Sequence, residues 1–156
     1  MNETKSVVWF RQDLRLKENP ALEFAATLGK VLPVYIFDQE HAGDWQLGKA
    51  SRWWLHHSLA SLDKSLNGSL RKFYGDPFKI LAKLVADENI DNVFWNRCYE
   101  PWIVSRDKKI KSEIQKLGLN VKSFNGSLLY EPWEVLKSDG TPYKVFTPYY
   151  RQTLSK

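Results

Sequence analysis

Five short apolar runs are separated by segments in which apolar residues recur at helical spacing. The runs predicted to be strands are Val7–Phe10, Val31–Phe37, Leu70–Tyr74, Asn92–Asn96 and Asn120–Phe124. Strands that alternate with helices in this way are typical of a parallel sheet whose two faces are covered by the connecting helices. The alternation therefore predicts an α/β fold with a five-stranded parallel sheet and helices on both faces.

The segments between the strands carry helix signals of their own. Asn19-Pro20 combines a side-chain cap with a proline in the first turn, both of which are favoured where a helix begins. The strongest helix pattern runs from Ala50 to Leu66, where leucines repeat along one face. Further helices are expected to begin at Asp76-Pro77 and at Pro101. Pro33 is unusual for a central strand, because proline has no N–H to donate to a neighbour.

Composition excludes several classes of protein. The 156 residues suffice for one ordinary domain, and a net charge of +5 permits an anionic partner without requiring one. Cys98 is the single cysteine, so no internal disulfide and no cysteine-rich metal site is expected. We see neither a signal peptide nor a long apolar segment, so we expect a cytoplasmic protein without a membrane segment. The seven tryptophans fit either a core of large side chains or a surface that stacks on a planar partner.

Polar side chains follow the first and fourth predicted strands. Arg11, Gln12, Asp13 and Arg15 come after the first, and the segment from Asn96 to Glu100 comes after the fourth. With the usual strand order these two strands are neighbours, and their carboxyl ends border the ligand crevice of such sheets. Because the first loop has no glycine, a ligand would be held there by side chains. The alternative is that these charges form salt bridges between loops, with Asp13 and Arg15 as the favoured structural pair.

The residues alone indicate no catalytic or metal site. We find no phosphate-binding glycine loop, no nucleophile motif and no zinc-binding helix motif. His56 and His57 are adjacent on a predicted helix, so they point to different sides and cannot ligate one metal together. Arg52, in the first turn of the same helix, is suited to an anion. These patterns indicate a domain that binds a planar ligand or a nucleotide, without visible catalysis.

Five sequence blocks, taken in order, resemble the DNA photolyase/cryptochrome family. The first is Trp9–Leu16 followed by Asn19–Leu22, and the other four are Pro33–Asp38, Ser51–Leu55, Trp95–Trp102 with Arg106-Asp107, and Tyr143–Pro148. They extend over nearly the whole chain, and the nearest resemblance is to bacterial photolyases that repair cyclobutane pyrimidine dimers. The resemblance implies a Rossmann-like antenna domain over residues 1–130. It further implies that residues 131–156 lead toward a helical FAD-binding domain that is absent from this sequence.

The function implied by the resemblance is light harvesting. In the family such a domain holds a deazaflavin, a flavin or a folate, which passes excitation to FAD in the helical domain. That helical domain would be this chain's partner, and damaged DNA would be contacted only through it. Carbon–carbon lyase activity would belong to the intact photolyase, which repairs pyrimidine dimers with blue light. A cryptochrome-type photoreceptor or docking domain is the alternative; a stand-alone domain for ATP or AMP is disfavoured by the missing glycine loop.

The resemblance also indicates chromophore-binding residues. Asp13 and Arg52 correspond to pocket residues of deazaflavin-binding relatives, whereas Cys98 stands where those relatives have an acidic residue. Folate-binding relatives have an Asn-Glu pair where this chain has Trp102-Ile103. We expect Ile36 and Trp102 to form apolar walls and Arg52 to bind an anionic tail. The predicted set is Asp13, Ile36, Arg52, Cys98, Glu100 and Trp102, with no catalytic residue and no metal ligand.

Overall fold

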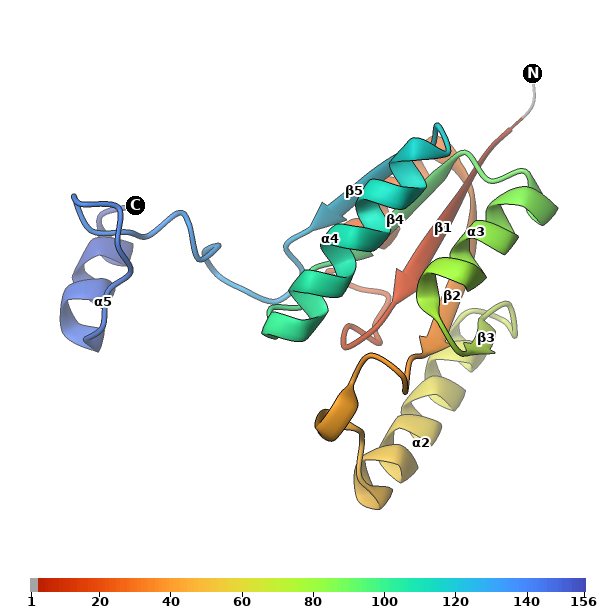
Figure 1. The fold of residues 1–156 in the computed structure, drawn as a ribbon, viewed down its shortest axis with the longest axis horizontal. Helices are drawn as coiled ribbons and strands as arrows, with labels where there is room; N and C mark the ends of the chain where they lie inside the picture. Colours follow the sequence, from red (N-terminus) through yellow and green to blue (C-terminus); the bar gives the residue numbers. More distant parts are fainter. Residues whose placement is uncertain (1–2) are drawn as a thin grey trace. The chain divides into compact units, whose positions relative to one another are not determined.

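A computed structural model describes residues 3–156 (Figure 1). The chain divides into two compact units, the first ending at Gly126 and the second running from Ser127 to Lys156. The division falls close to residue 130, where the sequence predicts the end of the antenna domain. The two units are described separately below.

The first unit is built on five parallel strands. They are β1 (Thr4–Phe10), β2 (Gly29–Phe37), β3 (Arg71–Tyr74), β4 (Asn92–Asn96) and β5 (Asn120–Phe124). The strand order is β3-β2-β1-β4-β5, and every pairing is parallel. This arrangement confirms the predicted sheet and the predicted adjacency of β1 and β4. The ends of these two strands consequently border one crevice.

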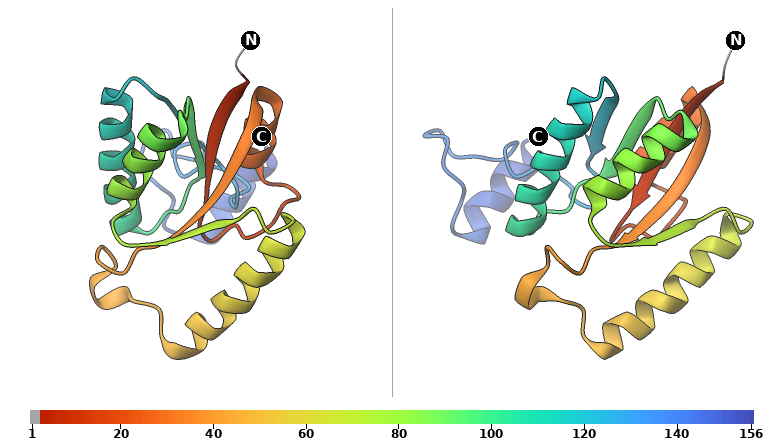
Figure 2. Two further views of the ribbon diagram at one scale, coloured as in Figure 1. Left: turned by 90° about the vertical axis from the view of Figure 1, so that its right-hand side faces the viewer. Right: turned by 45° about the vertical axis from the view of Figure 1, so that its right-hand side comes forward.

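Helices cover both faces of the sheet, as predicted. They are α1 (Pro20–Leu28), α2 (Lys49–Ser65), α3 (Pro77–Glu88) and α4 (Pro101–Lys116), and a short 3-10 helix, η1 (Gly43–Trp45), precedes α2. Figure 2 shows α3 and α4 side by side on one face. Leu81 of α3 and Ile114 of α4 share one buried cluster, whereas Ala25 of α1 and Leu59 of α2 belong to another on the opposite face.

The central strand β1 explains why its sequence is apolar without interruption. Val7 and Trp9 belong to the cluster beneath α3 and α4, and Val8 and Phe10 belong to the cluster beneath α1 and α2. All four side chains are at most 1% exposed. A strand covered on both faces needs apolar residues at every position rather than at alternate ones.

Pro33 lies within β2, a strand with neighbours on both sides. It is opposite Val8 of β1, and the pairing of β2 with β3 begins only at Val34. The proline therefore precedes the stretch in which both edges of β2 are paired. The strand accommodates a residue without an N–H because that position has one neighbouring strand instead of two.

Helix α2 packs on the sheet through its C-terminal half. Its buried residues are Leu59 and Leu62, whereas Trp53 and Trp54 in its first two turns are 64% and 70% exposed. Figure 1 and Figure 2 show the N-terminal end of α2 directed away from the sheet.

The second unit, Ser127–Lys156, contains a tight turn and one helix. Leu136 and Pro142 form an antiparallel bridge, and α5 spans Phe146–Leu154. None of the residues of α5 is buried. Its aromatic rings stack on one another, with Phe146 and Tyr150 centred 5.5 Å apart.

Replacing Gly29 with alanine should destabilise the fold. Gly29 joins α1 to β2 with φ of +144°, and a Cβ there would lie 2.4 Å from the carbonyl oxygen of Thr4. We expect Gly29→Ala to lower the free energy of unfolding in urea by about 2 kcal/mol or more. Gly48→Ala is the control, because no atom lies within 4 Å of its Cβ position. Equal stability losses in the two variants would contradict the steric argument.

Candidate functional site

A cavity of about 970 Å³ lies at the carboxyl end of the sheet. Four groups of residues line it: the ends of β1, β2 and β3, the loop before α2, one side of α2, and the start of α4. They are Trp9, Arg11, Gln12, Tyr35–Gln39, Ala42, Trp45–Leu47, Arg52, Leu55, His56, Leu59, Ala60, Lys72, Tyr74, Cys98, Glu100–Ile103 and Arg106. Open α/β sheets bind ligands at this edge, where β1 and β4 connect to opposite faces.

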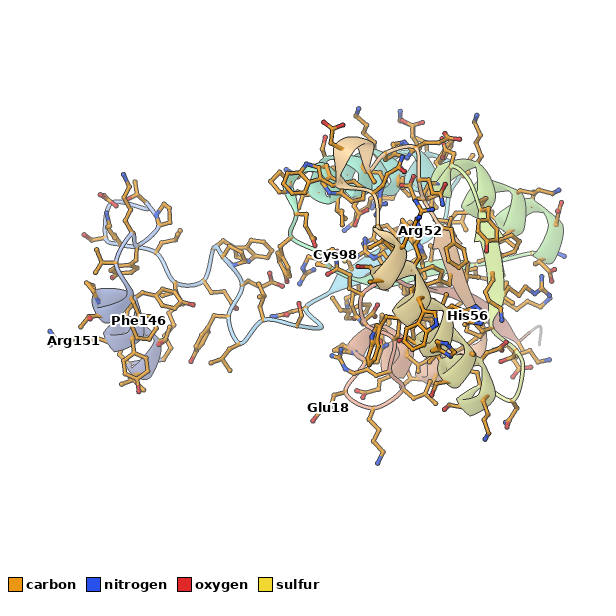
Figure 3. All side chains as sticks on the ribbon, turned by 90° about the horizontal axis from the view of Figure 1, so that it is seen from below. Glu18, Arg52, His56, Cys98, Phe146 and Arg151 are labelled. Carbon is orange, nitrogen blue, oxygen red and sulfur yellow. The ribbon has the colours of Figure 1, made fainter. Side chains whose placement is uncertain are left out.

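Five of the six predicted binding residues line this cavity. Ile36 comes from β2, Arg52 from the first turn of α2, and Cys98, Glu100 and Trp102 from the segment that joins β4 to α4. Figure 3 labels Arg52 and Cys98 at this end of the first unit. The tertiary structure thus brings together residues that are widely separated in the sequence. The sixth residue, Asp13, is not among the lining residues.

Asp13 is instead part of a buried polar network. One carboxylate oxygen accepts a hydrogen bond from Nδ2 of Asn96 at 2.6 Å, and the other accepts one from the backbone N–H of Arg11 at 2.8 Å. Nδ2 of Asn96 also donates to Oδ1 of Asn19 at 2.7 Å, and Oδ1 of Asn96 accepts from the N–H of Ala21 at 3.1 Å. The network joins the loop after β1 and the start of α1 to the end of β4.

The predicted ion pair between Asp13 and Arg15 is wrong. The Arg15 guanidinium donates to the carbonyl oxygens of Glu18, at 2.9 Å, and of Gly126. Arg15 is exposed, whereas Asp13 is 9% exposed and points into the network around Asn96. Their proximity in sequence does not bring the two charged groups together, because the backbone turns between them and sends the side chains to different environments.

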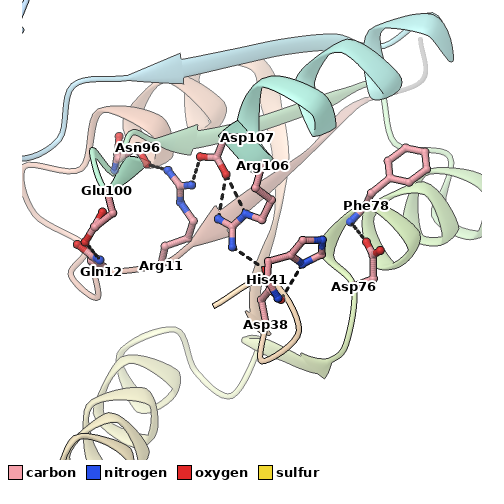
Figure 4. Close-up of polar contacts among 10 residues, drawn as sticks. All are labelled: Arg11, Gln12, Asp38, His41, Asp76, Phe78, Asn96, Glu100, Arg106 and Asp107. Atoms are coloured by element: carbon pink, nitrogen blue, oxygen red, sulfur yellow. Dashed lines mark hydrogen bonds and ion pairs between the residues drawn. The ribbon is translucent and has the colours of Figure 1, made fainter. Parts of the chain in front are cut away.

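Two arginines and two aspartates form a chain of buried ion pairs beside the cavity (Figure 4). Nη1 of Arg106 lies 2.8 Å from Asp38, and Nη2 lies 2.9 Å from Asp107. Asp107 also binds Arg11, whose Nη2 donates to the carbonyl oxygen of Asn96. The four charged side chains are at most 12% exposed. Two cations and two anions compensate one another, as buried charges require.

Sequence reasoning assigned no role to Asp38, Arg106 or Asp107. Asp38 directly follows β2, and a charged residue at the carboxyl end of a strand is a sequence signal for a position beside the ligand crevice. Arg106 and Asp107 lie inside α4, where a charged pair ordinarily indicates a solvated face. They are 8% and 9% exposed, and their partners Asp38 and Arg11 come from the ends of β2 and β1.

Hydrogen bonding lowers the pKa of Asp38. Burial alone would raise the pKa of this carboxyl, but the side chains of His41 and Arg106 and the backbone N–H of His41 all donate to it. Because they stabilise the carboxylate, the net shift is downward. The His41 ring nitrogen Nδ1 lies 2.9 Å from Asp38 and ties the loop before α2 to the same carboxylate.

The inner wall of the cavity has few sources of negative charge. Burial raises the pKa of Tyr35 to about 12, so its hydroxyl stays protonated at neutral pH. Burial also raises the pKa of the Cys98 thiol, although the nearby Arg11 partly opposes the shift. A protonated thiol is a poor nucleophile and carries no negative charge. Glu100 adds a second carboxylate to the lining besides Asp38, and it accepts a hydrogen bond from Gln12 at 2.6 Å.

The mouth of the cavity is basic and aromatic. Nε of Arg52 donates to the carbonyl oxygen of Leu47 at 2.7 Å, which holds the exposed guanidinium at the N-terminal end of α2. No acidic residue occupies the first turn of this helix. Lys72 also lines the cavity but is paired with Asp63 at 2.7 Å. Arg52 is thus the arginine best placed to meet an anionic group, and the helix end adds partial positive charge.

Neither a metal cluster nor a membrane-spanning helix is found in residues 3–156. No group of three or more histidine, cysteine, aspartate or glutamate side chains there has the geometry to hold a metal ion. No helix in that range is long and apolar enough to cross a membrane.

Replacing Asp13 with alanine should affect stability more than ligand binding. The substitution leaves the Nδ2 group of Asn96 without its 2.6 Å acceptor in a buried site. We expect a loss of about 2–4 kcal/mol in the free energy of unfolding. Because Asp13 is outside the cavity lining, ligand affinity measured well below the melting temperature should change less than twofold, roughly. A large loss of affinity in a folded Asp13→Ala chain would place Asp13 in the binding site instead.

The Asp38 carboxylate should make the free energy of unfolding depend on pH in the acidic range. Its pKa is lower in the folded chain than in the unfolded chain, so its contribution is present above the ordinary aspartate pKa and lost as pH falls through the folded value. Between about pH 4 and pH 2 the native chain should therefore lose more unfolding free energy than Asp38→Asn does. Asp44→Asn, an exposed position in η1, is the control. If the unfolding free energies of the native chain and of Asp38→Asn fell in parallel as the pH is lowered, this role of Asp38 would be refuted.

Comparisons with a family profile and with individual proteins agree on one family. The DNA photolyase family profile matches residues 6–156. A deoxyribodipyrimidine photo-lyase of Agrobacterium fabrum is 46% identical over 149 residues, which are 93% of this chain and 30% of the relative. Cryptochrome-1 of Arabidopsis thaliana is 38% identical, over 96% of this chain and 23% of the relative. The chain thus spans about a third or less of the length of these relatives.

Solved structures share the fold. A bacterial class III photolyase from Agrobacterium tumefaciens superposes with a TM-score of 0.91 at 41% identity, covering all of this chain and 33% of that protein. An archaeal photolyase from Sulfolobus tokodaii, described with two FAD molecules, has a TM-score of 0.75 at 23% identity over 96% of this chain and 34% of its own. From the match over nearly all of its residues, the chain belongs to the DNA photolyase family.

Proposed function

We propose that the cavity at the carboxyl end of the sheet holds a planar antenna chromophore. The observation that carries this proposal is the cavity itself. Its volume of about 970 Å³ is at the upper end of what small-molecule sites offer, which suits an extended ring system with a tail. It also lies at the edge of the sheet where folds of this class bind their ligands.

The side chains around the cavity suit a ring system with an anionic tail. Ile36 and Trp102 offer apolar surface, and Tyr35 adds a half-buried, uncharged ring. Arg52 at the mouth can pair with phosphate or carboxylate, for which a guanidinium is well shaped. Glu100 and Cys98 lie between these walls and provide polar atoms. Asp13 supports the site indirectly, through Asn96 and the backbone of Arg11.

The identity of the chromophore is a choice among deazaflavin, flavin and folate. The protonated Cys98 does not reproduce the negative charge at that wall in deazaflavin-binding relatives, and Trp102-Ile103 replaces the Asn-Glu pair of folate-binding relatives. The archaeal photolyase that shares this fold is described as containing two FAD molecules, with the implication of a novel light-harvesting cofactor. Flavin is therefore the first ligand to test.

The intact protein is proposed to be a light-driven DNA repair enzyme of the cytoplasm. Because the chain spans about a third of its photolyase relatives, we infer a further helical domain that binds FAD and contacts damaged DNA, with residues 131–156 leading toward it. Repair of UV-induced pyrimidine dimers in blue light by the full-length protein tests this inference. A full-length protein that binds FAD but repairs no dimer would favour the cryptochrome alternative, to which Cryptochrome-1 of Arabidopsis thaliana is the pertinent relative.

Arg52 should set the affinity for chromophores with an anionic tail. We expect Arg52→Gln to weaken FMN binding about fivefold to tenfold and riboflavin binding less, since riboflavin lacks the phosphate. Lys49→Gln is the matched control, because Lys49 is exposed at the start of α2 but outside the cavity lining. Fluorescence titration of the purified chain measures both. Equal losses for FMN and riboflavin would show that Arg52 does not contact the tail.

Trp102 should contribute the aromatic wall. Trp102→Ala is expected to weaken binding of every planar chromophore that the chain takes up by about tenfold, the equivalent of roughly 1–2 kcal/mol of stacking. Trp54→Ala is the control, because Trp54 is 70% exposed and does not line the cavity. Titrations with FMN, 8-hydroxy-5-deazariboflavin and methenyltetrahydrofolate complete the test. Failure of all three to bind the native chain would overturn the proposed function.

A further inference from the structure

The Arg106 guanidinium lies between two indole rings. Its carbon Cζ is 5.0 Å from the ring centre of Trp9 and 5.2 Å from that of Trp102. Trp9 is 1% exposed and Trp102 is half-buried, and both line the cavity. A second cation is also close to Trp9, because Cζ of Arg11 lies 5.0 Å from the centre of the same ring. A cation therefore lies next to two indole rings of the cavity lining.

The ion pairs of Arg106 leave its charge directed at these rings. A guanidinium is planar and donates its hydrogen bonds in its own plane. Nη1 donates to Asp38 and Nε and Nη2 donate to Asp107, so the carboxylates occupy the edges of the group. Both ring centres lie within cation–π distance of its carbon Cζ. The side chain of Arg106 is 7% exposed, so solvent screens its field weakly.

A tryptophan beside a photoexcited chromophore offers an unwanted reaction. If a chromophore is bound in the cavity, it would supply the excited state, and the indole of Trp102 could give up one electron to it and become a cation. The same electron would then return to the indole, both partners would be back in their ground states, and the excitation would be lost as heat. This cycle competes with energy transfer to an acceptor. A nearby positive charge opposes it, because forming a second cation at the indole becomes less favourable.

We propose that Arg106 keeps Trp102 a poor electron donor, so that the stacked chromophore retains its excitation. The inference rests on the proposed function, since it assigns a role to the wall of the same cavity. Arg106 acts through Trp102 and is a positioning residue with an electrostatic effect. The buried ion pairs with Asp38 and Asp107 are what hold the charge at the ring.

Excited FMN serves as the probe of this effect. The rate at which each chain quenches excited FMN is measured by time-resolved emission and transient absorption. When FMN is bound, the quenching rate is the decay rate of the excited FMN. When FMN is free in solution, the quenching rate is the second-order rate constant with which the chain quenches the FMN triplet state. Each variant is paired with the same variant carrying Trp102→Phe. The difference isolates the quenching by Trp102 from that by the six other tryptophans.

Charge-removing and charge-keeping variants should behave differently. Arg106→Gln should increase the Trp102-dependent quenching about fivefold, the change expected from losing one cation–π contact. Arg106→Lys retains the positive charge and should stay within about twofold of the native value. An unchanged rate in Arg106→Gln would overturn the proposal. So would an equal rise in Arg106→Lys, because that result would assign the effect to ring position instead of charge.

In a third variant, Asp38→Asn, we expect the Trp102-dependent quenching to change in the opposite direction. Asp38→Asn removes one of the two carboxylates bound to Arg106, so the cation at Trp102 is less compensated. Its Trp102-dependent quenching should fall about twofold. Asp38→Asn also keeps the proposal testable if Arg106→Gln, which leaves two carboxylates without this partner, does not fold by circular dichroism. A rise in quenching in Asp38→Asn would refute the electrostatic effect.

The outcomes separate this inference from the proposed function. Failure of FMN, deazaflavin and folate to bind overturns the antenna proposal. The second-order triplet measurement still tests the electrostatic effect on Trp102. Conversely, tight chromophore binding together with equal quenching in the native chain and Arg106→Gln retains the antenna and removes the role of Arg106.

Discussion

The buried ion pairs among Arg11, Asp107, Arg106 and Asp38 hold together the elements that form the cavity. They connect the carboxyl ends of β1 and β2 to α4, and each charge is compensated by a neighbour. Removal of one member would leave a charge in a poorly solvated place, which is more costly than losing an exposed pair. The geometry of the cavity's inner wall depends on this constraint, and Trp102 is positioned by the same arginine that binds Asp38 and Asp107.

The opposite wall is built on a different physical basis. Helix α2 is anchored by Leu59 and Leu62 in its C-terminal half, and its first two turns are exposed. A helix attached at one end leaves space between its other end and the sheet edge. The cavity therefore has a rigid side made of strands and ion pairs and a side made of a partly attached helix. Sites that admit a bulky ligand commonly combine a fixed frame with a less stable element.

Much of the fold was predictable from residues alone. The strands and the neighbouring positions of β1 and β4 follow from apolar runs, capping residues and the rules for parallel sheets. Five of the six predicted binding residues line the cavity, because the carboxyl ends of parallel strands meet at one edge. The role of Asp13 was not predictable in this way. Its carboxylate binds Asn96, which is 83 residues away in the sequence.

By itself, the sequence determined the class of the fold, the edge of the sheet at which the cavity lies and the family, since these follow from local patterns and ordered motifs. Only the tertiary structure decided which charged groups are buried together. Arg106 and Asp107 have the appearance of a solvated pair within a helix, yet they are 8% and 9% exposed. Burial is decided by the tertiary fold, which places α4 beside Arg11 and Asp38 at the ends of β1 and β2, and the energy of a charge depends on partners that only this arrangement supplies.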